Sequence, residues 1–398
     1  MTNFLSAGLK ENSIKAVWFF TALVSSLAVL FILGYLVINA VPIFTETGIT
    51  GFLFSTDWNP AGSSPSYGVL ALIVDTLLVT FGAMVIAVPL GIFSAVYLAY
   101  LAPRKLREVL KPVIELLAGI PSVVYGFFGM IVLCGFLQNM LDIPSGFSWL
   151  AASIILGIMA LPTIVSVSED ALTAVPKDYT EGSLGLGTTK WQTISRVLIP
   201  AAFSGITAAV ILGIGRAIGE TMAVMMVAGN SAVIPSPIWD VLSPVRTLTA
   251  TLGIEIGEVA VGSMHYYALF GVAAVLLVIT LAVNVISSKI TERLKTGKPL
   301  FTIPQKIKKM MLVTLAVLAF AFLIYAFGIF TAAVISVIAA LIYFIHRKIS
   351  CGTSQKIAFG LIISSVIITV GALVIILSNI FINGLPAISL EFLTSSPS

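Results

Sequence analysis

Two residues of opposite charge, Arg216 and Glu220, lie near the middle of an apolar run from Ile199 to Ala228. An ionisable side chain at the centre of a bilayer costs at least ~2.5–3.5 kcal/mol, so both residues must face protein or water. On one continuous helix they would form an (i, i+4) pair, although the order with Arg first is the weaker one. A planar guanidinium also matches the oxygens of an anion bidentately. The pair therefore indicates either an intramembrane anion site or an ion pair that joins helices.

The element that positions this pair must cross a membrane, because the whole chain has the composition of a membrane protein. Of its 398 residues, 59% are hydrophobic and 10% are charged, whereas soluble domains carry about 25% charged residues. The alternating strands that a membrane barrel requires do not occur. We predict an all-α integral membrane protein of the plasma membrane. Beside Arg216, the small residues Gly215 and Gly219 predict that a neighbouring helix approaches closely.

Nine apolar runs are long enough to cross a hydrocarbon layer of ~30 Å. They cover residues 16–40, 68–101, 109–138, 147–168, 200–228, 265–288, 310–327, 329–346 and 358–382. The first run is too long for a cleaved signal peptide, so we predict a retained span. The seventh and eighth runs are separated only by Gly328 and are expected to form a tight hairpin.

The basic residues predict the orientation of these spans. With nine spans, all of the 21 Lys and Arg residues except Arg216 and Arg246 fall in loops on one side of the membrane. By the positive-inside rule that side is the cytoplasm, so we expect a cytoplasmic N-terminus and an external C-terminus. The net charge of +4 is explained by this asymmetry and gives no reason to expect a nucleic-acid partner.

One short segment of the chain occurs twice. Ile-Asn-Ala-Val-Pro-Ile-Phe at residues 38–44 resembles Ile-Asn-Gly-Leu-Pro-Ala-Ile at residues 382–388, and each copy ends an outward span. Transporters are commonly built from two similar halves. We therefore interpret the last span as the start of a second half that ends after its first span, with chance similarity as the alternative.

The polar connection from Glu169 to Pro200 contains apolar residues at ordered spacing between Pro176 and Gly187, which predicts short amphipathic helices. Such helices lie on lipid or in a groove of another protein. The near balance of charge in this segment favours a protein. Thr188 stands where a phosphate-binding loop requires Lys, so the chain is not expected to hydrolyse ATP or to have a catalytic site. ATP and Mg²⁺ would be bound by another subunit, and no cofactor or metal is expected in this one.

This connection resembles the cytoplasmic signature of ABC-importer permeases, in which Glu-Ala-Ala-x-x-x-Gly precedes an apolar segment that ends in Pro. The matching residues are Glu181, Gly182, Ser183, Gly187 and Pro200. Gly182 and Ser183 replace the two alanines of the signature and keep both positions small. The resemblance implies that this segment is a coupling helix that docks on the ATPase subunits.

Four further stretches resemble the permeases of phosphate-specific ABC importers, of the PstC type in the MetI-like family. They are AVPLGIFSAVYLAYLAP, GIPSVVYGFFG, ALPTIVSVSEDAL and GRAIGETMAVMMVAGN. The resemblance covers residues 10–295 and implies a six-helix permease core, to which three further membrane helices are added. Residues 347–398 instead resemble the first span of the PstA-type partner permease. We therefore expect a permease domain over 1–298 with its coupling loop at 169–200, a helical hairpin over 299–346 and a truncated PstA-like span over 347–398.

The resemblance also implies partners and a substrate. The partners would be a PstA-type permease, a PstB-type ATPase dimer, a PstS-type external phosphate-binding protein and membrane lipid. Arg216 would lie in the phosphate pathway, with Glu220 tuning it, and Ser122 and Tyr125 after Pro121 are possible pathway-lining residues. The alternatives are a permease for tungstate, molybdate or sulfate, an ion-coupled secondary anion carrier, and a non-transporting chain.

Three polar residues near the external ends of spans receive simpler interpretations. Asp75 is expected to complement the N-terminal end of its helix. Arg246, the lone external cation, is either an interfacial anchor or a contact for an extracellular protein. His265 is expected to have no metal partner.

Overall fold

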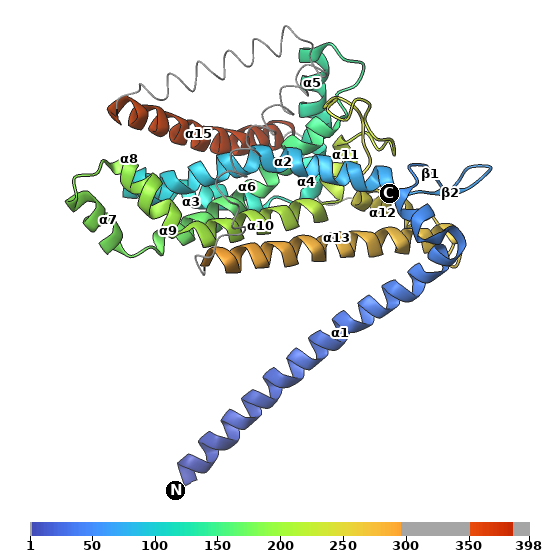
Figure 1. Cartoon of the computed structure of the whole chain (residues 1–398), viewed down its shortest axis with the longest axis horizontal. Coiled ribbons are helices and arrows are strands. Elements are labelled where there is room, and N and C mark those ends of the chain that lie inside the picture. The colour runs from blue at the N-terminus through green and yellow to red at the C-terminus, as the bar shows by residue number, and fades with distance from the viewer. Residues whose placement is uncertain (1, 296–350, 385–398) are drawn as a thin grey trace, which may run out of the picture.

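The computed structural model describes residues 2–295 and 351–384, which are mostly helical (Figure 1). The elements are α1 (Thr2–Phe54), β1 (Trp58–Asn59), β2 (Ser66–Tyr67), α2 (Leu70–Val96), η1 (Tyr97–Leu101), α3 (Arg104–Gly119), α4 (Ser122–Phe128), η2 (Gly129–Leu133), α5 (Cys134–Leu141), α6 (Trp149–Thr173), α7 (Lys177–Gly185), α8 (Lys190–Thr193), η3 (Ile194–Leu198), α9 (Ile199–Ala201), α10 (Phe203–Gly219), α11 (Met222–Val227), α12 (Leu248–Glu255), α13 (Met264–Lys295) and α15 (Cys351–Gly384). The three η elements are π-helical turns, and β1 pairs with β2 in a short antiparallel hairpin.

The prediction of an all-α membrane protein is confirmed. Within the described residues, six helices are long and apolar enough to cross a membrane, and a bent pair of helices forms a further candidate span. The six cover Ile14–Phe54, Leu70–Leu101, Ser122–Leu141, Trp149–Thr173, Met264–Lys289 and Gly352–Ile382. The predicted spans at 310–327 and 329–346, and with them the 299–346 hairpin, lie outside the described residues.

The span predicted over 109–138 is wrong in its first part. The chain is helical in α3, becomes extended at Ile120 and Pro121, and begins a new helix at Ser122. The residue before a proline disfavours helical backbone, which explains the break. The sequence of α3 is rich in Arg, Lys and Glu, so only the apolar segment Ser122–Leu141 is a candidate span.

The span predicted over 200–228 is also broken, at both of its ends. The helical pair Lys190–Ala201 and Phe203–Gly219 bends by 70° around Ala202. At the other end α10 stops at Gly219, Glu220 has extended backbone (φ −74°, ψ 127°), and α11 begins at Met222. The region is therefore three helical pieces with two joints, not one straight helix.

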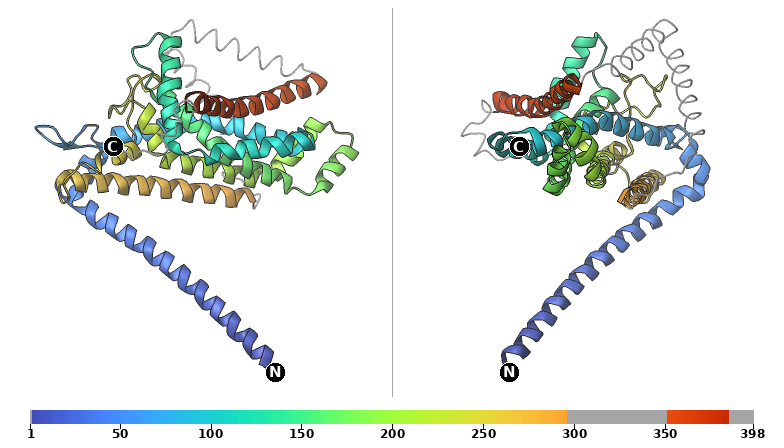
Figure 2. Two further views of the ribbon diagram at one scale, coloured as in Figure 1. Left: turned by 180° about the vertical axis from the view of Figure 1, so that it is seen from behind. Right: turned by 60° about the vertical axis from the view of Figure 1, so that its left-hand side comes forward.

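The centre of the bundle is the contact between α2 and α6, which lie side by side in Figures 1 and 2. Glycines in α2 allow this approach, because a Cβ at Gly82 would clash with Ser153, and a Cβ at Gly91 would clash with Ile164. Helix α10 packs on α6 on one side, and α15 packs along α2 on another. The buried hydroxyls of Ser94 and Thr369 meet at 3.3 Å in that second contact.

Helix α1 differs from the other long helices because its first half leaves the bundle (Figures 1 and 2). Its second half packs on α13, where Gly271 allows Phe52 and Ile43 to approach the helix backbone. Residues 14–32 are exposed throughout. Near its end α1 bends at Gly48, whose φ of +71° lies in the left-handed region that glycine tolerates best.

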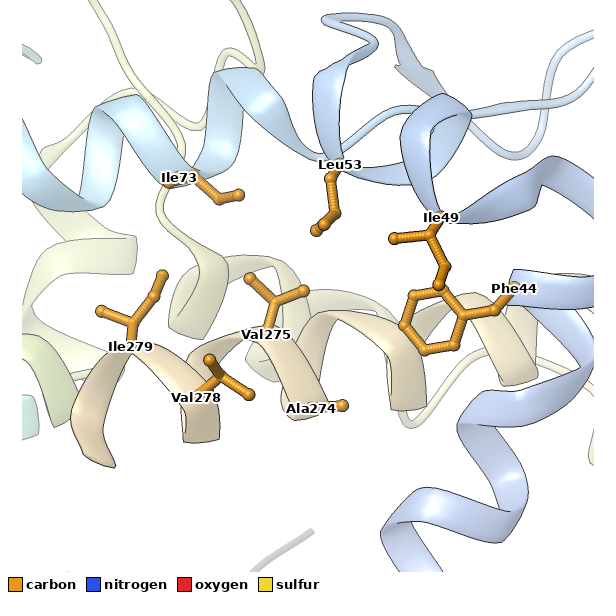
Figure 3. Close-up of a pocket in the computed structure, with 8 residues that line it drawn as sticks. All are labelled: Phe44, Ile49, Leu53, Ile73, Ala274, Val275, Val278 and Ile279. Atoms are coloured by element: carbon orange, nitrogen blue, oxygen red, sulfur yellow. The ribbon is translucent and has the colours of Figure 1, made fainter. Parts of the chain in front are cut away.

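The two ends of the bundle have different contents. We name them the α7 end, which carries α7, α8 and the start of α3, and the hairpin end, which carries β1, β2 and α12 (Figure 1). Between α1, α2 and α13, close to the hairpin end, lies a hollow of about 490 Å³. Figure 3 shows that all of its lining side chains are apolar, so it offers no group that could bind an anion.

Candidate functional site

Arg216 lies in the last turn of α10 and is exposed. Glu220 lies beyond the end of that helix, so the expectation that the two residues form an (i, i+4) pair on one helix is wrong. No ion pair joins them in the described part of the chain. The guanidinium is therefore not neutralised by Glu220 in this arrangement and is open to another anionic group.

Glu220 is held at the joint between α10 and α11 by two contacts. Its carboxylate Oε1 accepts a hydrogen bond from the backbone N–H of Ala223 at 3.3 Å, which satisfies a free donor in the first turn of α11. Its backbone carbonyl accepts a hydrogen bond from the Thr249 hydroxyl at 2.8 Å. These contacts replace backbone bonds that the broken helix lacks, so the joint is a built feature of the fold.

The surface of α10 around Arg216 has no covering helix in the described chain. A Cβ added at Gly215 or Gly219 would meet no heavy atom within 4 Å, and Leu212 on the preceding turn is exposed. The expected close approach of a neighbouring helix therefore does not occur among the described residues. The small-residue face of α10, which we define as Leu212, Gly215, Arg216 and Gly219, is available to another chain.

Ser122 and Tyr125 occupy the start of α4, directly after the break at Pro121. Ser122 is partly exposed, whereas Tyr125 is fully buried and donates its hydroxyl to the Leu117 carbonyl at 2.8 Å. Arg216 is close enough to Tyr125 to interact with it electrostatically. Tyr125 thus lies near the guanidinium, but its hydroxyl is already used inside the protein.

Helix α7 carries three of the predicted coupling residues, Glu181, Gly182 and Ser183, at one end of the molecule, where it projects beyond α8 (Figure 1). Glu181, Gly182 and Gly187 are exposed. Gly187 has a φ of +82° and directly follows the last helical turn, a position that favours glycine. Pro200 is exposed in α9, next to the 70° bend that leads into α10.

Ser183 is the predicted coupling residue whose structural position the sequence did not indicate. It is buried, and its hydroxyl lies 2.8 Å from that of Thr188 and 3.1 Å from that of Thr193. Thr188 and Thr193 are themselves 2.9 Å apart. This triangle of hydroxyls ties α7 to α8, and a capping box between Thr189 and Gln192 begins α8. Ser183 therefore positions α7, whereas its neighbours face outward.

The outward surface of α7 is apolar as well as polar. Leu186 is 87% exposed, and Tyr179 and Leu184 are also exposed. Exposed large apolar side chains on a short helix at the end of a molecule are typical of a segment that docks into a groove.

Glu169 joins α6 to α3 close to the α7 end. It is fully buried at the end of α6, and its carboxylate pairs with Arg107 and, at 2.6 Å, with Lys111 from α3. Lys111 also reaches Asp170 at 3.0 Å. The hydrogen bond to Glu169 raises the pKa of Lys111 above its ordinary value, because it stabilises the charged amine. This contact fixes α3 against α6. It therefore also fixes the position of the chain that leads into the break at Pro121.

A second charged cluster, at the hairpin end, was missed by the sequence analysis. Arg246 Nη2 pairs with Glu255 Oε1 at 2.6 Å, and His265 Nε2 lies 2.8 Å from Glu255 Oε2. Trp58 Nε1 donates to Glu255 at 3.2 Å. The Arg246 side chain is only 14% exposed, so it is neither a surface anchor nor a free contact for another protein. The sequence did contain one signal for this cluster, because Arg246 is the only Lys or Arg predicted on the external side of the membrane.

Asp75 joins the same cluster from α2. It is fully buried, and its Oδ2 accepts a hydrogen bond from the backbone N–H of Arg246 at 2.9 Å. Asp75 therefore binds a loop far along the chain and does not merely complement its own helix end. Among the described residues, no group of three or more His, Cys, Asp or Glu side chains could hold a metal ion.

Comparison with known proteins places this chain in a family. The model of the family described as binding-protein-dependent transport system inner membrane component matches residues 87–296. A probable ABC transporter permease of Bacillus subtilis (strain 168), YqgH, is 43% identical over 258 residues, which are 64% of this chain and 82% of that protein. The phosphate transport system permease PstC of Mesorhizobium japonicum is 38% identical over 62% of this chain and 80% of its own length. PstC of Pasteurella multocida is 31% identical over 74% of this chain and 95% of its own length.

Among solved structures, a chain of the MetNI methionine ABC transporter matches 57% of this chain and 94% of its own length, with 19% identity and a TM-score of 0.43. The family assignment rests on the sequence comparisons, in which the family model covers more than half of the chain. The chain belongs to the family of binding-protein-dependent transport system inner membrane components.

Proposed function

We propose that this chain is the transmembrane permease subunit of an ATP-driven importer of inorganic phosphate. The observation that carries the proposal is the position of Arg216, whose guanidinium is exposed in the last turn of α10, beside a joint in the helix. Broken membrane helices are a common way of building an ion site, because the joint lines a cavity. Relatives named as phosphate permeases support phosphate as the substrate.

The chemistry of Arg216 suits phosphate. A guanidinium is always charged and presents two parallel N–H donors to two oxygens of the anion. Glu220 lies next to this position but uses its carboxylate on the α11 backbone. In our proposal Glu220 keeps the joint in shape and limits how tightly the anion is held, so that phosphate can leave. Ser122, which is partly exposed, is a candidate lining residue, and the buried Tyr125 would hold the start of α4 through its bond to the Leu117 carbonyl.

The partner permease would cover the small-residue face of α10. Gly215 and Gly219 let another helix approach closely, and no helix in the described part of the chain packs against them. A PstA-type permease packed there would place the pathway between the two subunits, with Arg216 facing it. A pseudo-twofold pair of this kind supports alternating access to a midplane site.

The ATPase dimer, which would be PstB-type, would dock at the α7 end. The exposed Leu186 and Leu184 supply an apolar ridge, and Glu181 and Gly182 lie on the open surface of the same helix. ATP and Mg²⁺ would be bound by that dimer. A PstS-type binding protein would deliver phosphate at the hairpin end.

The finer points of topology and organisation belong to the same proposal. The chain would cross the plasma membrane nine times, with a cytoplasmic N-terminus and an external C-terminus. Arg104, Lys105, Arg107, Lys111, Lys177 and Lys190 belong to α3, α7 and α8 at the α7 end, in accord with a cytoplasmic location for it. The permease domain would extend over 1–298, and residues 347–398 would be a PstA-like first span, which α15 represents in the structure.

Phosphate uptake by the assembled system tests the proposal. Cells that lack their own PstC-type permease would receive this chain together with the PstA-type permease, the ATPase and the binding protein. We expect ATP-dependent uptake of radiolabelled phosphate, and a loss of about 10-fold or more in Arg216→Gln, since a charged hydrogen-bonded contact is worth ~1.5–3 kcal/mol. The matched control is Arg104→Gln, because Arg104 is exposed and pairs with Glu108 on the surface.

The outcomes separate the alternatives. Normal uptake by Arg216→Gln in an intact complex would show that Arg216 is not part of the phosphate pathway. Uptake that unlabelled molybdate, tungstate or sulfate suppresses better than unlabelled phosphate would point to another oxyanion. Uptake that survives ATP depletion but stops with an uncoupler would indicate an ion-coupled carrier.

A further inference from the structure

The charged cluster at the hairpin end contains two atoms without partners. Asp75 Oδ1 and Arg246 Nε are both buried, and neither has a hydrogen-bond partner among the described residues. They belong to residues already in contact, since the Arg246 backbone N–H donates to the other oxygen of Asp75. A buried carboxyl and a buried guanidinium N–H that are left unpaired are both unfavourable. Each is the chemical complement of the other.

The guanidinium of Arg246 is instead directed to Glu255, at 2.6 Å. Losing the Arg246 partner would cost Glu255 less free energy than the lack of a charged partner costs Asp75. Glu255 is partly exposed, and it keeps its contacts with His265 and Trp58. Asp75 is fully buried, and among the described residues no charged side chain pairs with it. The three side chains therefore allow a second arrangement, in which the Arg246 guanidinium pairs with Asp75.

We propose that Asp75, Arg246 and Glu255 form an external latch, in which Arg246 exchanges Glu255 for Asp75 when the permease opens to the outside. This inference rests on the proposed alternating-access function. Interfaces of this kind drive large movements because they have two discrete packed states. The structure would represent the closed state of the latch, with Arg246 on Glu255.

The fold shows what the exchange would move. Helix α12 begins at Leu248, whose backbone N–H is held by the Thr76 hydroxyl of α2 at 3.0 Å, and ends at Glu255. When Arg246 releases Glu255, the start of α12 stays on α2. The C-terminal end of α12 then moves together with β1 and α13, because Trp58 of β1 and His265 of α13 both remain bonded to Glu255. The helix would pivot about its first turn and open a gap towards α2 and α11.

The latch is also connected to the proposed phosphate site. Thr249, in the first turn of α12, donates its hydroxyl to the carbonyl of Glu220 at the joint beside Arg216. A rotation of α12 about its first turn would therefore turn the Thr249 hydroxyl and reorient its hydrogen bond to the joint. In this way the latch would link opening at the external end to the shape of the site near the middle of the membrane.

A cysteine reporter tests the latch. Thr251 follows the first turn of α12 and is fully buried, so Thr251→Cys in a background without the two native cysteines (Cys134→Ser and Cys351→Ser) should be labelled slowly by an impermeant maleimide added outside. The full chain, assembled with its partner subunits, is used. We expect Asp75→Asn to slow labelling at least threefold, because the amide still accepts the Arg246 N–H but offers no charge to the guanidinium. We expect Glu255→Gln to speed labelling at least threefold, because it weakens the closed state.

Opposite shifts are the critical result. A general loosening of the fold would accelerate labelling in both variants, and that outcome, or no change in either, would overturn the latch. Glu258→Cys, at an exposed position just beyond α12, is the control and should be labelled at one rate in all backgrounds. If Asp75→Asn does not assemble, Glu255→Gln alone decides, since unchanged or slower labelling refutes the proposal. The readout needs no phosphate uptake, so failure of the proposed substrate leaves this test intact.

Discussion

Two buried carboxyl groups lie at opposite ends of the bundle, and their surroundings differ. Glu169, at the α7 end, is fully buried and is held by two cations from α3. Asp75, at the hairpin end, is equally buried but has one backbone N–H as its partner and, among the described residues, one oxygen unpaired. A buried charge is tolerable when it is fully paired and costly when it is not. The first arrangement suits a fixed joint, and the second suits a part that moves.

This difference matches the demands on the two ends. The α7 end would transmit force from the ATPase and must hold α3, α6 and α7 in a fixed relation. The Glu169 carboxylate and the hydroxyl triangle of Ser183, Thr188 and Thr193 are all paired there. The hairpin end would open and close, and among the described residues it contains the two unpaired atoms that belong to charged groups, Asp75 Oδ1 and Arg246 Nε, whereas the buried atom left unpaired beside Glu169 is the neutral hydroxyl of Ser168.

A matched pair of variants, each changing a carboxylate into an amide, should produce the largest contrast. We expect Glu169→Gln to destabilise the protein by about 3 kcal/mol, because Arg107 and Lys111 lose the buried charge that they share. We expect Asp75→Asn to change stability by less than about 1 kcal/mol, because it removes a charge that has no paired cation and keeps the acceptor for Arg246. Thermal unfolding of the purified, detergent-solubilised protein measures both. Equal losses would end the distinction between the two ends.

The ionic contact at the α7 end also predicts a pH dependence. The pKa of Lys111 is raised in the folded protein by its hydrogen bond to Glu169. A raised pKa means that the contribution to stability is complete below the ordinary value of 10.5 and is lost as pH rises through the higher folded value. Unfolding temperatures measured from about pH 8 to 11.5 should fall at the alkaline end in the wild type. The fall should be smaller in Lys111→Met, and identical profiles would argue against the contact.

A smaller effect is expected from Ser183→Ala. Ser183 loses hydrogen bonds with Thr188 and Thr193, at a cost of ~1 kcal/mol, but the helix itself is retained. We expect α7 to become less firmly held, so that ATP hydrolysis by the assembled complex is coupled to less phosphate uptake, by about twofold to fivefold. Gly185→Ala is the control, because Gly185 is exposed on the same helix, is not one of the predicted coupling residues, and an added Cβ would meet open space. Uptake per ATP that is equal in both variants would contradict the positioning role.

The sequence was sufficient for the membrane class, the family and most of the membrane helices, because each depends on local composition or on a motif. It was insufficient where distant residues decide the backbone. Pro121 gave a local signal for one break. The joint at Glu220 has no proline, and its free backbone groups are satisfied by the Glu220 side chain and by Thr249, from a different helix. For that reason Arg216 and Glu220 were placed on one helix.

The external cluster was missed for the same reason. Asp75, Arg246, Glu255 and His265 come from α2, a loop, α12 and α13, and no spacing in the sequence relates them. What the sequence did offer was their rarity, since few charged residues occur near the external ends of the spans. In a chain of this composition, isolated charged residues near the ends of spans are better interpreted as parts of one buried cluster than as separate surface residues.

The 70° bend at Ala202 gives the molecule the geometry of a lever. On one side of this fulcrum stand α8, η3 and α9, which follow α7. On the other side α10 has 17 residues, a length of about 25 Å at 1.5 Å per residue. A rotation of only about 10° at the bend would carry the far end of α10 sideways by about 4 Å, more than the length of a hydrogen bond of ~3 Å. A small torque on α7 would thus be enough to shift Arg216, the residue that we propose contacts phosphate, by more than the length of one such bond.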